Sequence, residues 1–469
     1  MADALRVDVL VVGGGMAGLA AAAEAASAGA TVGVVEKARE LGGSAAMSAG
    51  ILWTARDYDE LRARMPQGEP DLGRVLTAEF PEAAAQVRAT GIEMSSQIDG
   101  PYFGFGTGWQ IDVRGLFQQW RARIETSGGW IVRGTAAREL LTNEDGRVRG
   151  ARTRGPDGPV DVEADAVVLA TGGFQGDPAL VAAFIGPHAD RLLVRSNPGS
   201  VGDGFRMAHS AGASASRSLG GFYGHLLPWP LPDFAERHFL PLTQYHSIHC
   251  ILVNRFGRRF IDESRGDEYS NQELLNQPEQ RAILLADDAT RRRYVVTAPY
   301  PRGEVVDRFA DAARAGGNYA QAATLDELVG AVAAWGVPTA DLRATLVDYG
   351  RAAAGDSVTL DAPLPARPAP LVEPPFHALE VQAAITFPLG GIRVDVDGRA
   401  LDRDGRPVPG LYACGADAGG VYHQGYGGGL AMSLVFGRRA GRAAAAASAG
   451  AGKDPRAQTD ALSMMGRPS

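Results

Sequence analysis

The chain has 469 residues and a formal net charge of -8. Because single hydrophobic cores stop growing at about 250–300 residues, this length predicts two domains. The negative charge disfavours nucleic acid or an anionic membrane surface as a partner.

The two cysteines, Cys250 and Cys414, are far apart in the sequence. Neither belongs to a CxxC motif or has a histidine at metal-ligand spacing, so we expect no metal site and no disulfide framework. The chain has no run of 18 apolar residues, which predicts no membrane span. Its start, MADALRVDVLVVGGG, lacks the basic segment and cleavage site of a signal peptide. Together these features predict a cytoplasmic protein.

The first elements are predicted to form a βαβ unit. Residues 7–12 (VDVLVV) are an apolar, β-branched run typical of a strand buried on both faces. A glycine turn follows at 13–18, then an alanine-rich helix over 19–28 and a second buried strand over 31–36.

The rest of the chain changes twice in composition and in the elements it predicts. A βαβ-like or β-rich stretch over 130–173 ends in a strand, 166–170, followed by Thr-Gly-Gly. Residues 222–387 carry most of the Tyr and His residues, proline-punctuated loops and a helical stretch near 325–354, and indicate an inserted domain. Strands and turns over 391–410 and a glycine-rich turn at 425–429 then lead into a helix that runs to about residue 447.

The N-terminal turn has the spacing of a dinucleotide-binding site. Gly13, Gly15 and Gly18 follow a buried strand and open a helix, the context that this pattern requires. Gly13 permits the tight turn, Gly15 lets a pyrophosphate approach the backbone and Gly18 lets helix and strand pack closely. Glu36 ends the second strand, where an acid can hydrogen-bond a ribose hydroxyl. The alternative, a glycine-rich turn without a ligand, does not account for strand, helix and acid together.

The following segment favours FAD over NAD. Residues 40–50 (ELGGSAAMSAG) form a loop of small residues where a plain NAD domain continues into its second crossover helix. Similar loops occur at 171–174 (TGGF) and 202–204 (GDG). Such loops suit an extended dinucleotide that lies across the backbone.

Five segments carry a family resemblance. VVGGGMAG with VVEKA, GGSAAMSAG, VVLATGGF, NRFGRRFIDE, and GLYACGADAGG with FGRRAG resemble, in order and spacing, the fumarate reductase/3-ketosteroid dehydrogenase superfamily of flavoproteins. The resemblance implies an α/β fold. A Rossmann-like FAD-binding domain of the glutathione-reductase type would comprise 1–221 and 388–450, and an inserted α+β capping domain 222–387, with substrate over the flavin at their junction. We expect a disordered tail over 451–469.

The resemblance also predicts how FAD is held. Relatives of the succinate dehydrogenase type attach FAD through a histidine in the loop after Gly-Gly, where this chain has Ser44, Ala45 and Ala46, so we expect noncovalent FAD. The helix after 427–429 would point its amides at the flavin pyrimidine edge and stabilise negative charge there. The residues expected to bind FAD are Gly13, Gly15, Met16, Ala17, Gly18, Glu36, Lys37, Gly42, Gly43, Ser44, Met47, Ser48, Ala49, Gly50, Ala137, Ala170, Thr171, Gly172, Asp203, Gly415, Asp417, Leu430, Ala431 and Met432.

The positions of the dicarboxylate clamp of fumarate reductases differ here. Phe387 and Tyr426 replace polar clamp residues, which removes about two charge-assisted contacts of roughly 1.5–3 kcal/mol each. A C4 dicarboxylate is therefore disfavoured. Arg265 retains the position of the active-site arginine acid in that family. The alternative for Arg265 is a surface salt bridge with Glu263, Asp267 or Glu268.

Tyr426 points instead to the ketosteroid dehydrogenase branch, where a tyrosine in this loop hydrogen-bonds the substrate ketone. The loop resembles the Δ4-type enzymes, although Gly428 replaces their serine and puts that serine's proton-transfer role in doubt. Tyr426, aided by the N–H of Gly429 or Leu430, would polarise a ketone and stabilise an enolate. A base in the inserted domain would remove the α proton while the β hydrogen leaves as hydride to flavin N5. The product is an enone, and the reverse reaction is ene reduction.

Three tyrosines are candidates for the base, and each could instead be a core residue. They are Tyr245 beside His246, Tyr223 near His225, and Tyr102. An ordinary tyrosine has a pKa of about 10, so the base needs a neighbour that lowers it. His423, in the glycine loop, is a further candidate for catalysis. The expected substrate contacts are Phe387, Tyr102, His225 and Gly429.

Two other functions stay open from the sequence. One is a reductase or dehydrogenase of an unsaturated carboxylate with Arg265 as the acid. The other is a flavoprotein subunit that passes electrons to a partner. The chain has no second dinucleotide-binding signature, so we expect a quinone, dioxygen or a carrier protein as the external electron acceptor or donor of a small-molecule oxidoreductase.

Overall fold

The computed structural model describes residues 5–99, 104–298 and 303–449 and divides into two compact units. The first unit comprises Met1–Gly186, Ser196–Phe222 and Phe387–Ser469, and the second comprises Pro187–Arg195 and Tyr223–Thr386. Pro187–Arg195, which sequence reasoning assigned to the FAD-binding domain, thus belong to the second unit. Tyr102 and the expected tail over 451–469 lie outside the described residues.

The first unit is built on a parallel sheet in the order β6-β2-β1-β9-β23. Its strands are β1 (Leu5–Val12), β2 (Val32–Glu36), β6 (Trp130–Arg133), β9 (Gly158–Leu169) and β23 (Pro407–Ala413). The strands β1, β2 and β9 are almost continuously apolar and buried where they pair, as expected for strands covered on both faces. Val35, Val12, Leu169 and Ala413 pair in one line across the sheet, so four strands end at the same edge.

Antiparallel strands extend this sheet. β7 (Ala136–Thr142) and β8 (Val148–Gly155) form a meander with the start of β9, and β22 (Arg399–Leu401) pairs with β23. The stretch over 130–173 is therefore β-rich rather than a second βαβ unit. A separate sheet contains β3 (Ile51–Thr54), β5 (Thr107–Gln110) and β4 (Ile98–Asp99).

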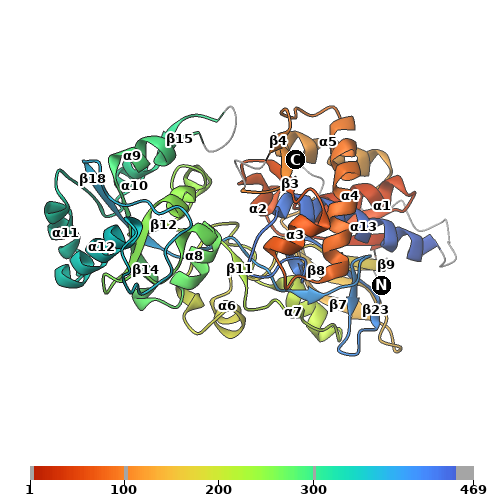
Figure 1. Cartoon of the computed structure of the whole chain (residues 1–469). Coiled ribbons are helices and arrows are strands. Elements are labelled where there is room, and N and C mark those ends of the chain that lie inside the picture. The colour runs from red at the N-terminus through yellow and green to blue at the C-terminus, as the bar shows by residue number, and fades with distance from the viewer. Residues whose placement is uncertain (1–4, 100–103, 299–302, 450–469) are drawn as a thin grey trace. The chain divides into compact units, whose positions relative to one another are not determined.

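The helices α1 (Met16–Ser27) and α13 (Gly429–Ala449) lie side by side in the first unit (Figure 1). Two glycines of α13 allow this close approach. A Cβ atom on Gly437 would lie 2.5 Å from the Ala17 carbonyl oxygen, and one on Gly441 would lie 2.1 Å from that of Ala21. The middle of α13 is thereby held against α1, the helix that follows the glycine turn.

Further helices complete the first unit. They are α2 (Gly43–Ala46), α3 (Tyr58–Arg64), α4 (Pro70–Ala89), α5 (Val113–Thr126), α6 (Pro178–Phe184) and α7 (Asp203–Ser210). No helix in the described part of the chain is long and apolar enough to cross a membrane.

The second unit has an antiparallel sheet. It contains β12 (Leu227–Pro228), β13 (Ile251–Asn254), β14 (Arg281–Ala286), β17 (Tyr319–Ala322) and β18 (Phe376–Gln382). The predicted helical stretch near 325–354 is two helices, α11 (Leu325–Ala333) and α12 (Thr339–Ala353). They are separated because Gly336 adopts a left-handed φ of 85° and the ring of Pro338 does not fit inside a helix.

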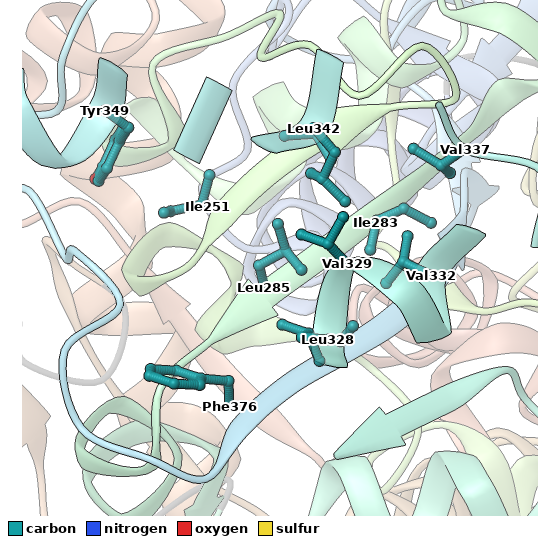
Figure 2. Packing of buried hydrophobic residues seen from close by; sticks show 12 residues of the cluster. Ile251, Ile283, Leu285, Leu328, Val329, Val332, Val337, Leu342, Tyr349 and Phe376 are labelled. Atoms are coloured by element: carbon teal, nitrogen blue, oxygen red, sulfur yellow. The ribbon is translucent and has the colours of Figure 1, made fainter. Parts of the chain in front are cut away.

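Apolar side chains between α11 and the sheet form a core of the second unit (Figure 2). Leu328, Val329 and Val332 of α11 pack with Ile283 and Leu285 of β14, and all five are at most 2% exposed. The spacing of the three helical residues puts them on one face of α11. This packing gives the second unit a core of its own, independent of the parallel sheet.

Candidate flavin and substrate site

The glycine turn at the end of β1 is shaped by what a side chain would strike. Gly13 has a φ of 111°, and a Cβ atom there would lie 2.2 Å from the Ala170 carbonyl oxygen. A Cβ atom on Gly18 would lie 1.9 Å from the Gly13 carbonyl oxygen. Both positions therefore require glycine, the first for the turn and the second for packing of α1 against it.

Gly15 and Gly43 have room beside them. The nearest atom to a Cβ on Gly15 is the Gly42 carbonyl oxygen at 3.7 Å, and nothing lies within 3.9 Å of one on Gly43. The backbone at the starts of α1 and α2 is thus uncrowded at these two glycines. A helix N-terminus beside uncrowded backbone suits the pyrophosphate of a dinucleotide, because its amides and dipole favour negative charge. The residues present fit FAD.

Glu36 holds the turn from the neighbouring strand. One carboxylate oxygen accepts the Gly14 N–H at 2.7 Å, and the other accepts the Ala38 N–H at 2.7 Å. Each oxygen has a second lone pair, so the carboxylate can still accept a ribose hydroxyl. The adjacent Lys37 pairs with Asp203, the first residue of α7, at 2.5 Å.

Asp417 joins the ends of β9 and β23. Its carboxylate accepts hydrogen bonds from the Thr171 N–H at 2.5 Å, the Thr171 hydroxyl at 3.0 Å and the Gly173 N–H at 2.9 Å. Burial raises the pKa of Asp417, against the opposing effect of these bonds. The side chain is 1% exposed, so its bonds to the Thr171–Gly173 loop fix the shape of a predicted cofactor loop from inside the protein.

The other residues predicted to bind FAD also belong to the first unit. The Gly42 N–H donates to the Gly14 carbonyl at 2.9 Å, and the Ser44 hydroxyl accepts the Asn197 N–H at 3.1 Å. The half-buried ones are Gly15, Lys37, Gly43, Ser44, Met47, Ser48, Ala49, Thr171, Gly172 and Asp203. The buried ones, besides Asp417, are Met16, Ala17, Gly18, Glu36, Gly42, Gly50, Ala137, Ala170, Gly415, Leu430, Ala431 and Met432.

Tyr426 lies at the start of α13 among aromatic rings. Its ring makes edge contacts with Trp53 at 5.8 Å, Tyr422 at 5.9 Å and Phe387 at 6.1 Å between centroids. The Gly429 N–H donates to the Tyr426 hydroxyl oxygen at 2.8 Å. A hydrogen bond received by a phenol oxygen polarises its O–H, so the predicted help from Gly429 reaches a carbonyl through Tyr426.

The glycine loop beside Tyr426 has a backbone that a serine cannot follow. Gly428 has a φ of 102°, and a Cβ atom there would lie 1.7 Å from the Trp53 carbonyl oxygen. This contact is a physical reason why the serine of the Δ4-type enzymes is replaced here. In the same loop, Nδ1 of His423 is buried and has no hydrogen-bond partner among the described residues.

Three polar residues from the sequence prediction meet in the second unit. Nδ1 of His225 hydrogen-bonds the Asp267 carboxylate, and its Nε2 hydrogen-bonds the Tyr223 hydroxyl at 2.7 Å. The Tyr245 ring lies edge-on to His225 at 4.8 Å and accepts a hydrogen bond from Arg195 on its hydroxyl at 3.0 Å. Sequence reasoning did not assign a role to Arg195, since no motif relates it to residues fifty or more positions away.

The cluster has perturbed proton affinities. Burial lowers the pKa of His225 well below its usual value, and the Arg195 charge lowers it further. Burial raises the pKa of Asp267 to about 6. Burial and the adjacent Asp267 raise the pKa of Glu268 to about 8. Near neutral pH, His225 is therefore neutral and the two carboxyl groups share a proton.

Arg265 is exposed and lies over the Tyr269 ring, with the guanidinium carbon 5.1 Å from the ring centroid. The suggested salt-bridge partners are engaged elsewhere, Glu263 with Arg259 at 2.5 Å and Asp267 with His225. Within the described ranges, Arg265 forms no ion pair. The same residues contain no group of three His, Cys, Asp or Glu side chains placed to hold a metal ion.

Comparison with known proteins agrees with the geometry of the first unit. The FAD binding domain family matches residues 8–430. The chain is 28% identical to fumarate reductase (cytochrome) of Shewanella frigidimarina over 94% of this chain and 77% of that protein. It is also 28% identical to 4-oxocyclohexanecarboxylate 2-dehydrogenase of Sinomonas cyclohexanicum over 94% of this chain and 93% of that protein.

A solved structure shares the fold. The crystal structure of 3-ketosteroid delta1-dehydrogenase from Sterolibacterium denitrificans has a TM-score of 0.76 and 20% identity, over 94% of this chain and 99% of that one. The predicted α/β fold and the suspected superfamily are thereby confirmed. The chain belongs to the FAD binding domain family and is an FAD-dependent dehydrogenase or reductase that acts on CH–CH groups.

Proposed function

We propose that this flavoprotein dehydrogenates a cyclic ketone between its α and β carbons, or reduces the corresponding enone. The observation that carries the proposal is the Tyr426 hydroxyl, which accepts the Gly429 N–H at 2.8 Å at the start of α13. A hydroxyl polarised in this way is a strong donor to a substrate carbonyl. It stabilises the enolate that forms when the α proton leaves.

The surroundings of Tyr426 favour a neutral ring as substrate. Phe387, Trp53 and Tyr422 make T-shaped contacts with the Tyr426 ring, and Phe387 stands where a dicarboxylate clamp has a polar residue. FAD, when bound, takes up the β hydrogen together with its electron pair. Tyr426 then has only to orient the carbonyl and hold the developing negative charge. His423, with its buried Nδ1, is a further candidate contact for a polar group of the substrate.

The relatives support this proposal in different degrees. One is named as a dehydrogenase of 4-oxocyclohexanecarboxylate, a ring ketone that also bears a carboxylate. Another is named as a fumarate reductase, which acts on an unsaturated carboxylate. The second candidate function, reduction or dehydrogenation of a carboxylate, is favoured by one observation in this chain. Arg265 is exposed and has no ion pair within the described ranges.

An anaerobic flavin-bleaching assay separates these functions. Oxidised holoenzyme is mixed with a panel of saturated cyclic ketones and of saturated carboxylates, and loss of the oxidised flavin band is followed by stopped flow. We expect ketones to bleach the flavin and Tyr426→Phe to slow this step by about 100-fold or more. Tyr412→Phe is the matched control, because Tyr412 is a buried tyrosine of β23 in the same unit.

The alternatives give different patterns in the same assay. Bleaching by carboxylates alone, lost in Arg265→Ala and kept in the exposed control Arg258→Ala, would support the carboxylate function instead. If no compound of the panel bleaches the flavin and an enone does not reoxidise the dithionite-reduced enzyme, an electron-transfer subunit becomes the better proposal. We further propose that a quinone, dioxygen or a carrier protein is the external electron partner, to be ranked by the rate at which each reoxidises reduced enzyme.

A further inference from the structure

Four side chains of the second unit form one hydrogen-bonded chain. Glu268 hydrogen-bonds Asp267, Asp267 hydrogen-bonds Nδ1 of His225, and Nε2 of His225 hydrogen-bonds the Tyr223 hydroxyl. The two central residues are buried, His225 at 5% and Asp267 at 9% exposure. Tyr223 and Glu268, at the two ends, are only half-buried. The chain is thus closed in its middle and accessible at both ends.

We propose that Tyr223, His225, Asp267 and Glu268 form a proton relay, in which Tyr223 exchanges a proton with the substrate α carbon and Glu268 exchanges it with solvent. The inference rests on the proposed function for its substrate. It assigns the acid or base to Tyr223 rather than to Tyr245, and it gives His225 a position in proton transfer rather than in substrate binding.

The hydrogen bonds set the direction of transfer. Because the pKa of Glu268 is the higher of the two, the proton shared by the carboxyl pair lies on Glu268 near neutral pH, and the Asp267 carboxylate accepts the Nδ1–H of His225 and leaves Nε2 with a lone pair. Nε2 accordingly accepts the O–H of Tyr223. If the Tyr223 proton moves to Nε2, His225 becomes an imidazolium next to the Asp267 carboxylate. The negative charge of Asp267 stabilises this cation, in the same way that a carboxylate stabilises the protonated histidine of a catalytic triad.

Tyr245 lacks such a partner. Its hydroxyl accepts a hydrogen bond from Arg195, and a guanidinium cannot take up a proton. Arg195 itself is fully buried and further bonded to the hydroxyls of Thr243 and Thr386, which fixes it in place. Tyr245 is therefore better suited to shape the cluster than to transfer a proton.

The step balances in both directions. In dehydrogenation the α C–H bond breaks, its proton goes to the Tyr223 oxygen, and its electron pair becomes the second bond between the α and β carbons. The β hydrogen leaves with its own electron pair to oxidised FAD. The Tyr223 proton moves to His225, the Nδ1 proton to Asp267, and one proton leaves the Asp267–Glu268 pair to solvent. Ene reduction runs these transfers in reverse.

The charged and titratable groups around His225 define the pH behaviour. They are Asp267 and Glu268 of α8 (Asp267–Leu274), Arg195, Tyr223 and Tyr245. The carboxyl pair is the group whose proton count changes near neutral pH, because burial raises both of its pKa values. Solvent exchange through the relay should therefore follow the titration of the pair.

The test isolates proton transfer from hydride transfer. Dithionite-reduced holoenzyme cannot accept a hydride, so exchange of the α protons of a saturated cyclic ketone in D2O, followed by NMR, reports the acid–base step alone. We expect Tyr223→Phe to slow exchange by about 100-fold or more and His225→Gln by about tenfold or more. The matched control, Tyr349→Phe, changes a buried tyrosine of α12 outside the relay and should stay within about threefold. Exchange that survives in Tyr223→Phe, or that is lost equally in Tyr349→Phe, overturns the relay.

A second measurement needs no substrate. In holoenzyme labelled with ¹⁵N-histidine, His225 should be the neutral Nδ1–H form between pH 6 and about 8, and Tyr223→Phe should shift its Nε2 resonance. A proton on Nε2 in place of Nδ1, or an Nε2 resonance that does not shift in Tyr223→Phe, overturns the relay. If these signals behave as expected while no ketone exchanges or bleaches the flavin, the proposed function fails and the hydrogen-bonded chain does not.

Discussion

Removing the Asp417 carboxylate should destabilise the first unit even without FAD. In Asp417→Ala the N–H groups of Thr171 and Gly173 lose their acceptor inside a site that is 1% exposed. A buried donor left unsatisfied costs about 1–3 kcal/mol, so two of them cost about 4 kcal/mol in free energy of unfolding. Asp417→Asn keeps one acceptor oxygen and should lose about half as much.

The assay is urea unfolding of the apoprotein and of the FAD-loaded protein, followed by circular dichroism. Asp161→Ala is the control, because Asp161 is an exposed carboxylate of β9 in the same unit. It should change the free energy of unfolding by no more than about 0.5 kcal/mol. An Asp417→Ala apoprotein within about 1 kcal/mol of wild type would refute this reasoning and would make Asp417 a direct contact of FAD instead.

Three further predictions concern separate sites. Gly428→Ser should lower the melting temperature and release FAD, because its Cβ would lie 1.7 Å from the Trp53 oxygen. The control is Gly146→Ser, which has a φ of 75° but no atom within 4 Å of its Cβ, and it should lower the melting temperature much less. Equal effects of the two substitutions would contradict this prediction. Glu268 has a folded-state pKa of about 8 against an ordinary 4.5, so its contribution to stability is lost as pH rises from about 4.5 through about 8. The melting temperature of Glu268→Gln should therefore gain on wild type over that range, and a constant difference would argue against the raised pKa. Arg259→Met should cost about 3–5 kcal/mol in urea unfolding, because it leaves buried Glu263 unpaired; adding Glu263→Leu should recover most of this loss.

Much of the first unit follows from local sequence. The β-branched run before Gly13, the alanine-rich helix and the acid at Glu36 each depend on neighbours within about twenty residues. Strand, turn and helix follow in the predicted order, although α1 begins at Met16, inside the turn predicted over 13–18. Gly13 and Gly18 could be assigned from their spacing alone, because a backbone position with no room for a Cβ atom requires glycine.

Other features depend on contacts between distant segments. The Asp417 bonds to Thr171 and Gly173 join residues almost 250 positions apart, and sequence reasoning interpreted Asp417 only as a contact of FAD. The stretch near 325–354 was predicted as one helical region, although Gly336 and Pro338 were visible as the signals that divide it.

The sequence by itself determined the cofactor, the parallel sheet and the tyrosine in the last glycine loop, because each depends on short-range patterns of glycines, strands and helix starts. Only the tertiary structure decided which of Tyr223 and Tyr245 has a base beside it. Tyr223 and His225 are two residues apart, but Asp267 and Arg195 come from distant positions and meet them only in the folded second unit. Proton affinities depend on burial and on neighbouring charge, and neither is set until the chain has packed.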